Sequence, residues 1–440
     1  MRLPQVATAL KPLACAALLA GAVSAADPEF TLSGGSSVSF GYIHESSDTS
    51  SYKYSGNRMQ SLGAQVLLKA KMSPEFTISA GLGIVERHYL SGSIGNTGGR
   101  TPFINPVYPV EADFNYAWWD EEGSKLALTG GYFPYSYNPD VKNLGLYLLR
   151  GPVYPGILVG GFETKYTRPV ANNLGVRLQH VIGGFDQNLI INSETETFPL
   201  YDISPAYIAH YRFGQAFKIG AGVNLSHRIA VDRRLTRPER KDSISLDNLG
   251  AITVVDTVTH DTTFMSFSGT KVMADAVFDP KAFFGSEILG PDDLKLYAEV
   301  AVIGLDRSAP YKKVYGDLKR RMPVLVGFNF PVFRVLDHLS LEVEWYGSRV
   351  KDDLSRYQAS TGNQYSPLPV DNTPNLNLAK DDWKWSVHAE RKLGQFRFSG
   401  QVASDHSRPG GIQTSPSSEW EAYFITPSDW YWVLKAGFFF

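Results

Sequence analysis

The amino-acid sequence predicts an all-β protein, a transmembrane up-and-down antiparallel β-barrel of about 16 strands, within a range of roughly 14 to 18. Three observations support this fold class. Apolar and polar residues alternate with period two along many segments, and the connections between these segments alternate between long and short. Beyond the N-terminal leader, no stretch approaches the roughly 18 apolar residues of a membrane helix. Only a closed sheet would then satisfy every backbone polar group in lipid.

The first 25 residues have the features of a secretory signal peptide. Arg2 and Lys11 supply positive charge, an apolar run covers residues 12–23, and small residues at 23–25 form a cleavage pattern. We therefore expect residues 26–440 to form one transmembrane β-barrel domain with long extracellular loops and short periplasmic turns. The only cysteine, Cys15, lies in the leader, so the mature chain would offer no disulfide and no thiolate metal ligand.

The charge balance and the motif content point away from several functions. The chain has 42 basic and 44 acidic residues, which gives no reason to expect a nucleic-acid partner. The zinc-protease, phosphate-loop and serine-hydrolase motifs do not occur in the sequence, so we expect no enzymatic activity and no cofactor. The acidic pair Asp292-Asp293 lacks the spacing of an EF-hand and is interpreted as part of a turn.

The expected strands share apolar residues on one parity and polar residues on the other, as in barrel strands with a lipid face and a lumen face. Residues 60–72, for example, place Leu62, Val66 and Leu68 opposite Gln65 and Lys69. The expected strands are 30–44, 60–72, 75–85, 110–118, 125–135, 156–166, 174–182, 205–213, 217–225, 267–278, 294–303, 322–330, 339–346, 383–391, 396–404 and 430–440.

The connections between these segments give an independent indication. The long ones are 45–59, 86–109, 136–155, 183–204, 226–266, 304–321, 347–382 and 405–429. The connections between them are mostly short, with the exception of residues 279–293. This alternation is typical of an up-and-down outer-membrane barrel, whereas a soluble sandwich gives no reason for it.

The last strand, within residues 428–440, has one wholly apolar face that ends on an aromatic residue. It resembles the C-terminal strand of Gram-negative outer-membrane β-barrels, the porins among them. The resemblance implies that Trp432, Leu434, Phe438 and Phe440 form the barrel-closing signal that the barrel assembly machinery recognises. It also implies export through the periplasm to the outer membrane of a Gram-negative bacterium, and contact with outer-membrane lipids and lipopolysaccharide. Trimers are common among porins, so a homo-trimer is a further expectation.

With the apolar parity toward lipid, the opposite parity predicts the side chains that line the pore. A lysine or arginine in the middle of the membrane would cost ~2–4 kcal/mol, so these charges are expected to face an aqueous channel. The alternative is that they pair along the wall and only keep the interior wet. The predicted pore-lining residues are Lys69, Lys71, Glu111, Asp113, Lys125, Glu163, Lys165, Arg177, Lys218, Lys271, Asp275, Lys295, Glu299, Glu342, Glu344, Lys384, Glu390, Arg397 and Lys435.

The third long connection, residues 136–155, is unusually apolar for a loop because four leucines lie between positions 144 and 149. In porins the third long loop folds into the barrel and narrows it, and this connection is similar by position. We predict Asp140, Lys142 and Arg150 as polar members of a pore constriction. The alternative is a structural loop that packs on the rim.

The resulting hypothesis is a porin-like channel for passive diffusion of small hydrophilic solutes. Two alternatives remain open at this level. One is a lipid-face hydrolase that would use His180 and a nearby serine, since His180 has lipid-facing parity and is expected in the outer half of its strand. The other is a structural or adhesive barrel that binds partners through its long outer loops.

Overall fold

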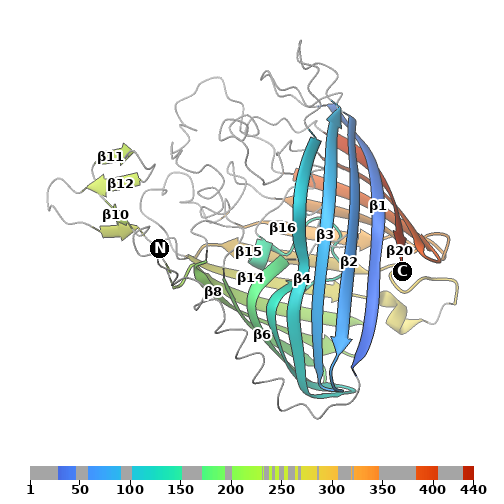
Figure 1. Cartoon of the computed structure of the whole chain (residues 1–440), viewed down its shortest axis with the longest axis horizontal. Coiled ribbons are helices and arrows are strands. Elements are labelled where there is room, and N and C mark those ends of the chain that lie inside the picture. The colour runs from blue at the N-terminus through green and yellow to red at the C-terminus, as the bar shows by residue number, and fades with distance from the viewer. Residues whose placement is uncertain are drawn as a thin grey trace, which may run out of the picture.

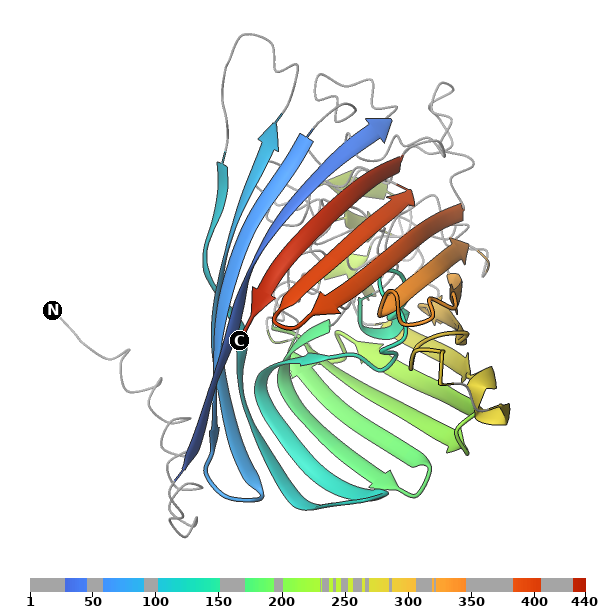
Figure 2. The same cartoon turned by 90° about the vertical axis from the view of Figure 1, so that its right-hand side faces the viewer.

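The computed structural model shows a closed barrel of 16 strands, each paired antiparallel to its neighbours (Figures 1 and 2). This confirms the predicted fold class and strand number. The structure describes residues 28–45, 58–90, 102–150, 171–193, 201–229, 231, 237–239, 243–246, 252–255, 263–265, 269–284, 287–305, 319, 322–345, 383–404 and 430–440. The expected signal peptide lies outside these residues.

The barrel strands follow one another around the sheet in chain order. They are β1 (Glu29–Glu45), β2 (Arg58–Lys71), β3 (Phe76–Leu90), β4 (Pro102–Glu121), β5 (Ser124–Tyr135), β6 (Ala171–Ile182), β7 (Phe185–Ser193), β8 (Ile203–Phe213), β9 (Phe217–Ser226), β14 (Gly269–Phe278), β15 (Leu296–Ile303), β16 (Val324–Asn329), β17 (His338–Trp345), β18 (Trp383–Leu393), β19 (Phe396–Ser404) and β20 (Trp430–Phe439).

Four short strands lie outside the barrel, in the connection between β9 and β14. β10 (Arg237–Glu239) pairs with β13 (Thr263–Met265), and β11 (Ser243–Leu246) pairs with β12 (Ile252–Val255). Within the described residues, the named helical elements are α2 (Tyr147–Arg150) and the 3-10 helix η3 (Pro280–Phe283). Among the described residues, no helix is both long and apolar enough to cross a membrane.

The first and last strands close the barrel by pairing with each other. Val38 of β1 lies opposite Ala436 of β20. At the very end of the chain, the backbone groups of Gly34 and Phe440 exchange two hydrogen bonds of 3.1 Å. Phe440 thus completes the ladder that removes the free edges of the sheet, since a closed barrel has none.

The two faces of the sheet differ as the period-two pattern predicts. Outward side chains of β2, such as Leu62 and Val66, are about half exposed. The inward side chains of β17 include Ser340, Glu342 and Glu344, all of which are buried. An apolar outer surface, with buried polar and charged side chains on the inner face of the wall, differs from the arrangement of a water-soluble protein and fits a lipid surrounding.

The structure corrects one part of the predicted strand order. The expected long connection 183–204 is wrong, because Gly183 and Gly184 form a tight turn that leads directly into β7. Gly183 has a φ of 57°, which glycine adopts without steric cost. β7 was not predicted because Asp186, Gln187 and Asn188 give it the composition of a loop.

A second correction follows from the pairing of β5 with β6. Tyr135 lies directly opposite Ala171, so no strand stands between β5 and β6 in the barrel. The predicted strand 156–166 lies outside the described residues. β6 therefore runs toward the short turns, and His180 lies near that end of the barrel and not in the outer half.

The main apolar core lies inside the barrel. Residues 136–150, here called the inner segment, pack against inward side chains of β5, β7, β8, β14, β15 and β16. Its buried members are Tyr137, Val141, Leu144, Leu146, Tyr147 and Leu148, and they meet Ile190, Ile208, Met273, Tyr297 and Leu325 of the wall. The segment is apolar because it fills one side of the interior.

Candidate functional site

The inner segment reverses direction at Gly145 and Leu146, which have φ angles of 77° and 57°. Two consecutive residues in this region turn successive backbone N–H groups toward the same side. A side chain at position 145 would place its Cβ 3.0 Å from Oε2 of Glu299 on β15. Glycine at 145 therefore allows the backbone to approach this carboxylate.

Glu299 and Glu342 hold the inner segment through its backbone. Glu299 accepts hydrogen bonds from the N–H groups of Leu146 (3.0 Å) and Tyr147 (2.8 Å). Glu342 of β17 accepts from the N–H groups of Asn143 (3.0 Å) and Leu144 (2.9 Å), and also from that of Lys142. Both carboxylates are only 1% exposed, so they are removed from solvent and bind the segment in place of water.

Three tyrosine hydroxyls complete this arrangement. Tyr137 donates to Glu299 at 2.6 Å, and Tyr297 donates to Glu342 at 3.1 Å. Tyr147 donates to Glu344 at 2.7 Å. Burial, and then the charge of the neighbouring carboxylate, raise the pKa values of Tyr137 and Tyr147 well above the ordinary tyrosine value. Both hydroxyls therefore remain protonated donors at neutral pH.

Polar side chains of the wall also hold the middle and the C-terminal part of the inner segment. Lys384 of β18 lies 3.4 Å from Glu344, and its neighbour Ser386 accepts a hydrogen bond of 2.8 Å from Asn143. Near the C-terminal end of the segment, the side-chain amide of Asn224 on β9 donates to the carbonyl of Leu148 at 3.0 Å. The segment is thus attached to β9, β15, β17 and β18, which come from distant parts of the sequence.

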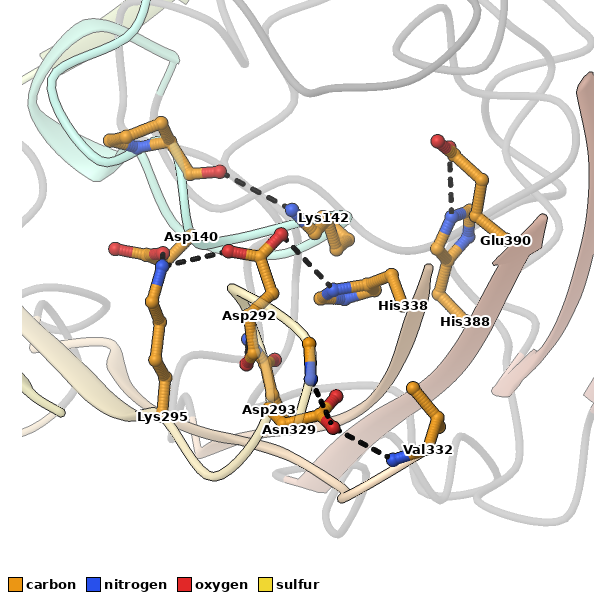
Figure 3. Close-up of polar contacts among 12 residues, drawn as sticks. Asp140, Lys142, Asp292, Asp293, Lys295, Asn329, Val332, His338, His388 and Glu390 are labelled. Atoms are coloured by element: carbon orange, nitrogen blue, oxygen red, sulfur yellow. Dashed lines mark hydrogen bonds and ion pairs between the residues drawn. The ribbon is translucent and has the colours of Figure 1, made fainter. Parts of the chain in front are cut away.

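A second polar cluster lies where the inner segment meets the short-turn end of β15 to β18 (Figure 3). Nζ of Lys295 lies 3.2 Å from Asp140 and 2.7 Å from Asp292. Burial alone would raise the pKa of Asp292, but the hydrogen bond and charge of Lys295 lower it overall, with a contribution from Lys142. Asp140 and Asp292 likewise raise the pKa of Lys295 against the effect of burial. This ion group therefore connects the segment to the β14–β15 turn across the neutral pH range.

Two histidines extend the cluster along β17 and β18 (Figure 3). The rings of His338 and His388 are 6.1 Å apart between centroids. His338 lies 4.0 Å from Asp292, and His388 lies 3.9 Å from Glu390. Arg397 of β19 approaches Glu390 to 3.6 Å. Within the described residues, no group of acidic, histidine or cysteine side chains has the geometry of a metal site.

Two of the three predicted constriction residues have side chains in the described part of the structure. Asp140 belongs to the ion group with Lys295, and Lys142 directs its ammonium to the carbonyl of Pro139 at 3.4 Å. Arg150 is the last residue of α2, and its side chain lies outside the described part of the structure. Asp140 and Lys142 are thus close together, at the start of the inner segment.

The predicted pore-lining residues that the structure describes all have the inward parity, apart from Lys295, which precedes β15. They occupy different surroundings. Glu299, Glu342, Glu344 and Lys384 lie beneath the inner segment. Glu390, Arg397 and Lys435 lie on the wall of β18 to β20, and Lys69, Lys71, Glu111, Asp113 and Lys125 lie on β2, β4 and β5. Arg177, Lys218, Lys271 and Asp275 lie on β6, β9 and β14, whereas Glu163 and Lys165 are outside the described residues.

Several of these wall charges have close partners. Lys69 lies 4.0 Å from Glu111, and Lys125 lies 2.5 Å from Asp120. Arg177 donates to Asn188 at 2.9 Å. Pairs along the wall, as the alternative interpretation expects, therefore account for part of the predicted set.

The C-terminal residues proposed as a signal lie on the outward face of β20. Leu434 is 59% exposed and Phe440 54% exposed. Trp432 packs with Phe40 at 5.6 Å between ring centroids, and Phe438 packs with Phe396 at 5.4 Å. The four side chains thus form an apolar row across the seam between β19, β20 and β1.

The tyrosines that bind the glutamates were not predicted from the sequence, and neither were Asp292 and the two histidines. Tyr297, His338 and His388 have the inward parity of their strands, which was a usable signal. Asp292 was interpreted as an ordinary turn residue, and only the fold brings it to Lys295. His180, considered for a hydrolase, has its Nδ1 3.3 Å from the side-chain nitrogen of Gln187.

Comparisons with known proteins add little to this description. No protein-family model and no curated protein sequence matches the chain. Similar solved structures include a mutant and a triple mutant of Rhodopseudomonas blastica porin, each 9% identical, with TM-scores of 0.39 and 0.41. Each match covers 94% of this chain and 100% of the porin chain. The fold assignment therefore comes from the strand pairing, which makes the chain a closed 16-strand antiparallel β-barrel, the architecture implied by the resemblance to porins.

Proposed function

We propose that this protein is an outer-membrane channel through which small hydrophilic solutes diffuse passively. The observation that supports the proposal best is the closed barrel with apolar side chains outside and charged side chains inside. Such a wall is stable only between lipid and water, and no covalent chemistry is required of it. On this view lipids and lipopolysaccharide surround the barrel, the assembly machinery recognises the last strand, and three copies associate.

We further propose that the inner segment narrows the passage. The segment occupies the side of the interior formed by β8, β9 and β14 to β17. Solutes would then pass between the segment and the opposite wall, where Lys69 and Glu111 lie. Asp140 and Lys142 would border this path, and Arg150 belongs to the same prediction.

Planar-bilayer recording of the refolded mature chain tests the proposal. We expect stepwise conductance, and a current in symmetric salt that changes when Lys142 or Arg150 is replaced by alanine. Lys392→Ala is the control for the loss of one lysine, because Lys392 is exposed at the end of β18 and is not part of the segment. The channel proposal is refuted if the protein binds detergent and has a β-sheet circular dichroism spectrum but produces no conductance steps. Lipid hydrolysis in the same preparation would instead favour the hydrolase.

A further inference from the structure

The connection between β14 and β15 carries an exposed apolar surface at the short-turn end of the barrel. Phe283 is 69% exposed, Phe284 45% and Ile288 66%. The adjacent turn between β16 and β17 adds Phe333 at 57% and Val335 at 73%. These five side chains are here called the apolar turn surface. A cluster of this kind marks an interaction site, because isolated turns in water rarely gather so many large apolar groups.

The apolar turn surface is held together by a buried carboxylate. Asp293, 1% exposed, accepts hydrogen bonds from the N–H groups of Gly290 (2.9 Å), Val332 (3.2 Å) and Phe333 (3.3 Å). Nζ of Lys281 donates to the backbone carbonyl of Asp293. Asp293 therefore joins the two turns into one unit, and the exposure of their apolar side chains is a fixed feature of the fold.

The same surface is continuous with the lipid-facing wall. Phe217 and Phe278 are cross-strand neighbours on the outward face of β9 and β14, with ring centroids 4.6 Å apart. Phe283 continues this row, at 6.2 Å from Phe278. In Figure 2 the yellow turn stands at the outer edge of the barrel, at the end of the strands that it joins. The row of rings thus leads from the wall to the turn without a break.

Cationic groups border the apolar side chains. Arg334 lies between Phe333 and Val335 in the chain, is exposed, and donates from Nε to the carbonyl of Leu289 at 3.4 Å. Arg391 donates to the backbone carbonyl of Arg334 at 2.7 Å and to the carboxylate of Asp337 at 3.2 Å, which places a second guanidinium at the same turn. Aromatic rings flanked by arginines are typical of the boundary between acyl chains and phosphate headgroups.

We infer that the two turns lie in the headgroup boundary of the adjacent membrane leaflet and anchor this side of the barrel to phospholipid. The inference extends the proposed membrane function and depends on it, because short turns at this end are otherwise expected in water. Phospholipid fits better than a second copy of the chain for two reasons. The surface continues the lipid-facing wall, and it carries arginines that can pair with the phosphates of headgroups.

Site-specific fluorescence tests the inference. The mature chain is expected to lack cysteine, so Phe283→Cys offers one site for a polarity-sensitive label. The control for lipid contact is Ile219→Cys, on the outward face of β9, and the control for water contact is Gln215→Cys, exposed in the β8–β9 turn. Each labelled protein is inserted into phosphatidylcholine vesicles containing lipids with a quencher near the headgroup or deep in the acyl chains.

We expect the label at position 283 to be quenched at least about twofold more by the shallow lipid quencher than by the deep one. The label at 219 should respond to lipid quenchers, and the label at 215 to an aqueous quencher. If position 283 behaves like 215, the inference is wrong while the channel stands. If the label at position 283 becomes more shielded from quenchers as the protein-to-lipid ratio rises, a second copy of the chain covers the surface. That result would overturn the inference as well. If 219 escapes lipid quenchers, the membrane function itself fails. Phe333→Cys repeats the test if the first variant does not fold.

Discussion

Replacing Glu342 with glutamine is the sharpest test of how the inner segment is held. The carboxylate accepts three backbone N–H groups and the hydroxyl of Tyr297. A glutamine amide keeps one acceptor oxygen and turns an NH₂ group toward donors, so about two donors lose their acceptor. At about 1–3 kcal/mol for each of the two buried donors left unsatisfied, attachment of the segment weakens by ~2–6 kcal/mol. Because every 1.4 kcal/mol is tenfold, the displaced population would rise by at least about 30-fold, and by roughly 20,000-fold at the upper end.

Single-channel recording provides the assay. We expect Glu342→Gln to show frequent transitions to further conductance levels that are rare in the wild type, because the released segment moves within the lumen. Glu111→Gln is the matched control, since Glu111 lies on the wall of β4 and the same charge is removed there. The mean conductance of Glu111→Gln can differ from that of the wild type, but the number of its conductance levels should be the same.

The reasoning is refuted if Glu342→Gln is folded and its current records have the same levels and noise as those of the wild type and Glu111→Gln. Folding is checked independently by the heat-dependent mobility of the barrel in detergent gels. A variant that folds and shows unchanged records would mean that the carboxylate contributes no net attachment. The apolar contacts of the segment would then hold it alone.

Three further predictions concern stability, pH and assembly. Gly327→Ala should destabilise the barrel by about 1–3 kcal/mol, measured by urea unfolding, because the new Cβ would overlap the ring of Tyr297. An unfolding midpoint equal to that of the wild type contradicts this prediction. Asp292→Asn should lower the thermal midpoint at neutral pH. Since Lys295 lowers the pKa of Asp292, the difference from wild type should persist above pH ~4 and disappear as the pH falls through that lowered pKa; a constant difference down to pH 2 contradicts it. Deletion of Phe440 should reduce the amount of assembled barrel in cells, because the backbone hydrogen bonds between Phe440 and Gly34 close the ladder. The measurement is the fraction with heat-modifiable mobility, and an unchanged fraction contradicts the predicted role of Phe440 in the barrel-closing signal.

The fold class could be predicted because lipid imposes a simple rule on each strand separately. β17 alternates strictly between polar and apolar residues, and it shows its polar face without reference to any other strand. β7 was not predicted because it carries a polar residue, Gln187, on its outward face. Gln187 accepts a hydrogen bond of 2.7 Å from Tyr207 on the next strand, which satisfies this polar group on the lipid side. A pattern along one strand cannot reveal such a partner.

The candidate site was predictable only in part. The apolar residues of the inner segment indicated that it leaves the water, and the parity of Glu299 and Glu342 indicated that both face inward. Their connection was not predictable, because more than 150 residues separate the segment from these glutamates. The sequence shows which charged residues have inward parity. It does not show which of them accept hydrogen bonds from the backbone of the inner segment.

The sequence alone determined that alternate side chains meet different surroundings, that about 16 strands close a barrel, and that one connection is too apolar for water. Period-two alternation and loop length are local properties, and they can be measured without a partner. Only the tertiary structure decided that Glu299, Glu342 and Glu344 lie beneath the inner segment, and that Asp293 joins two turns into one apolar surface. These contacts depend on which strands become neighbours when the barrel closes, and no stretch of sequence contains that information by itself.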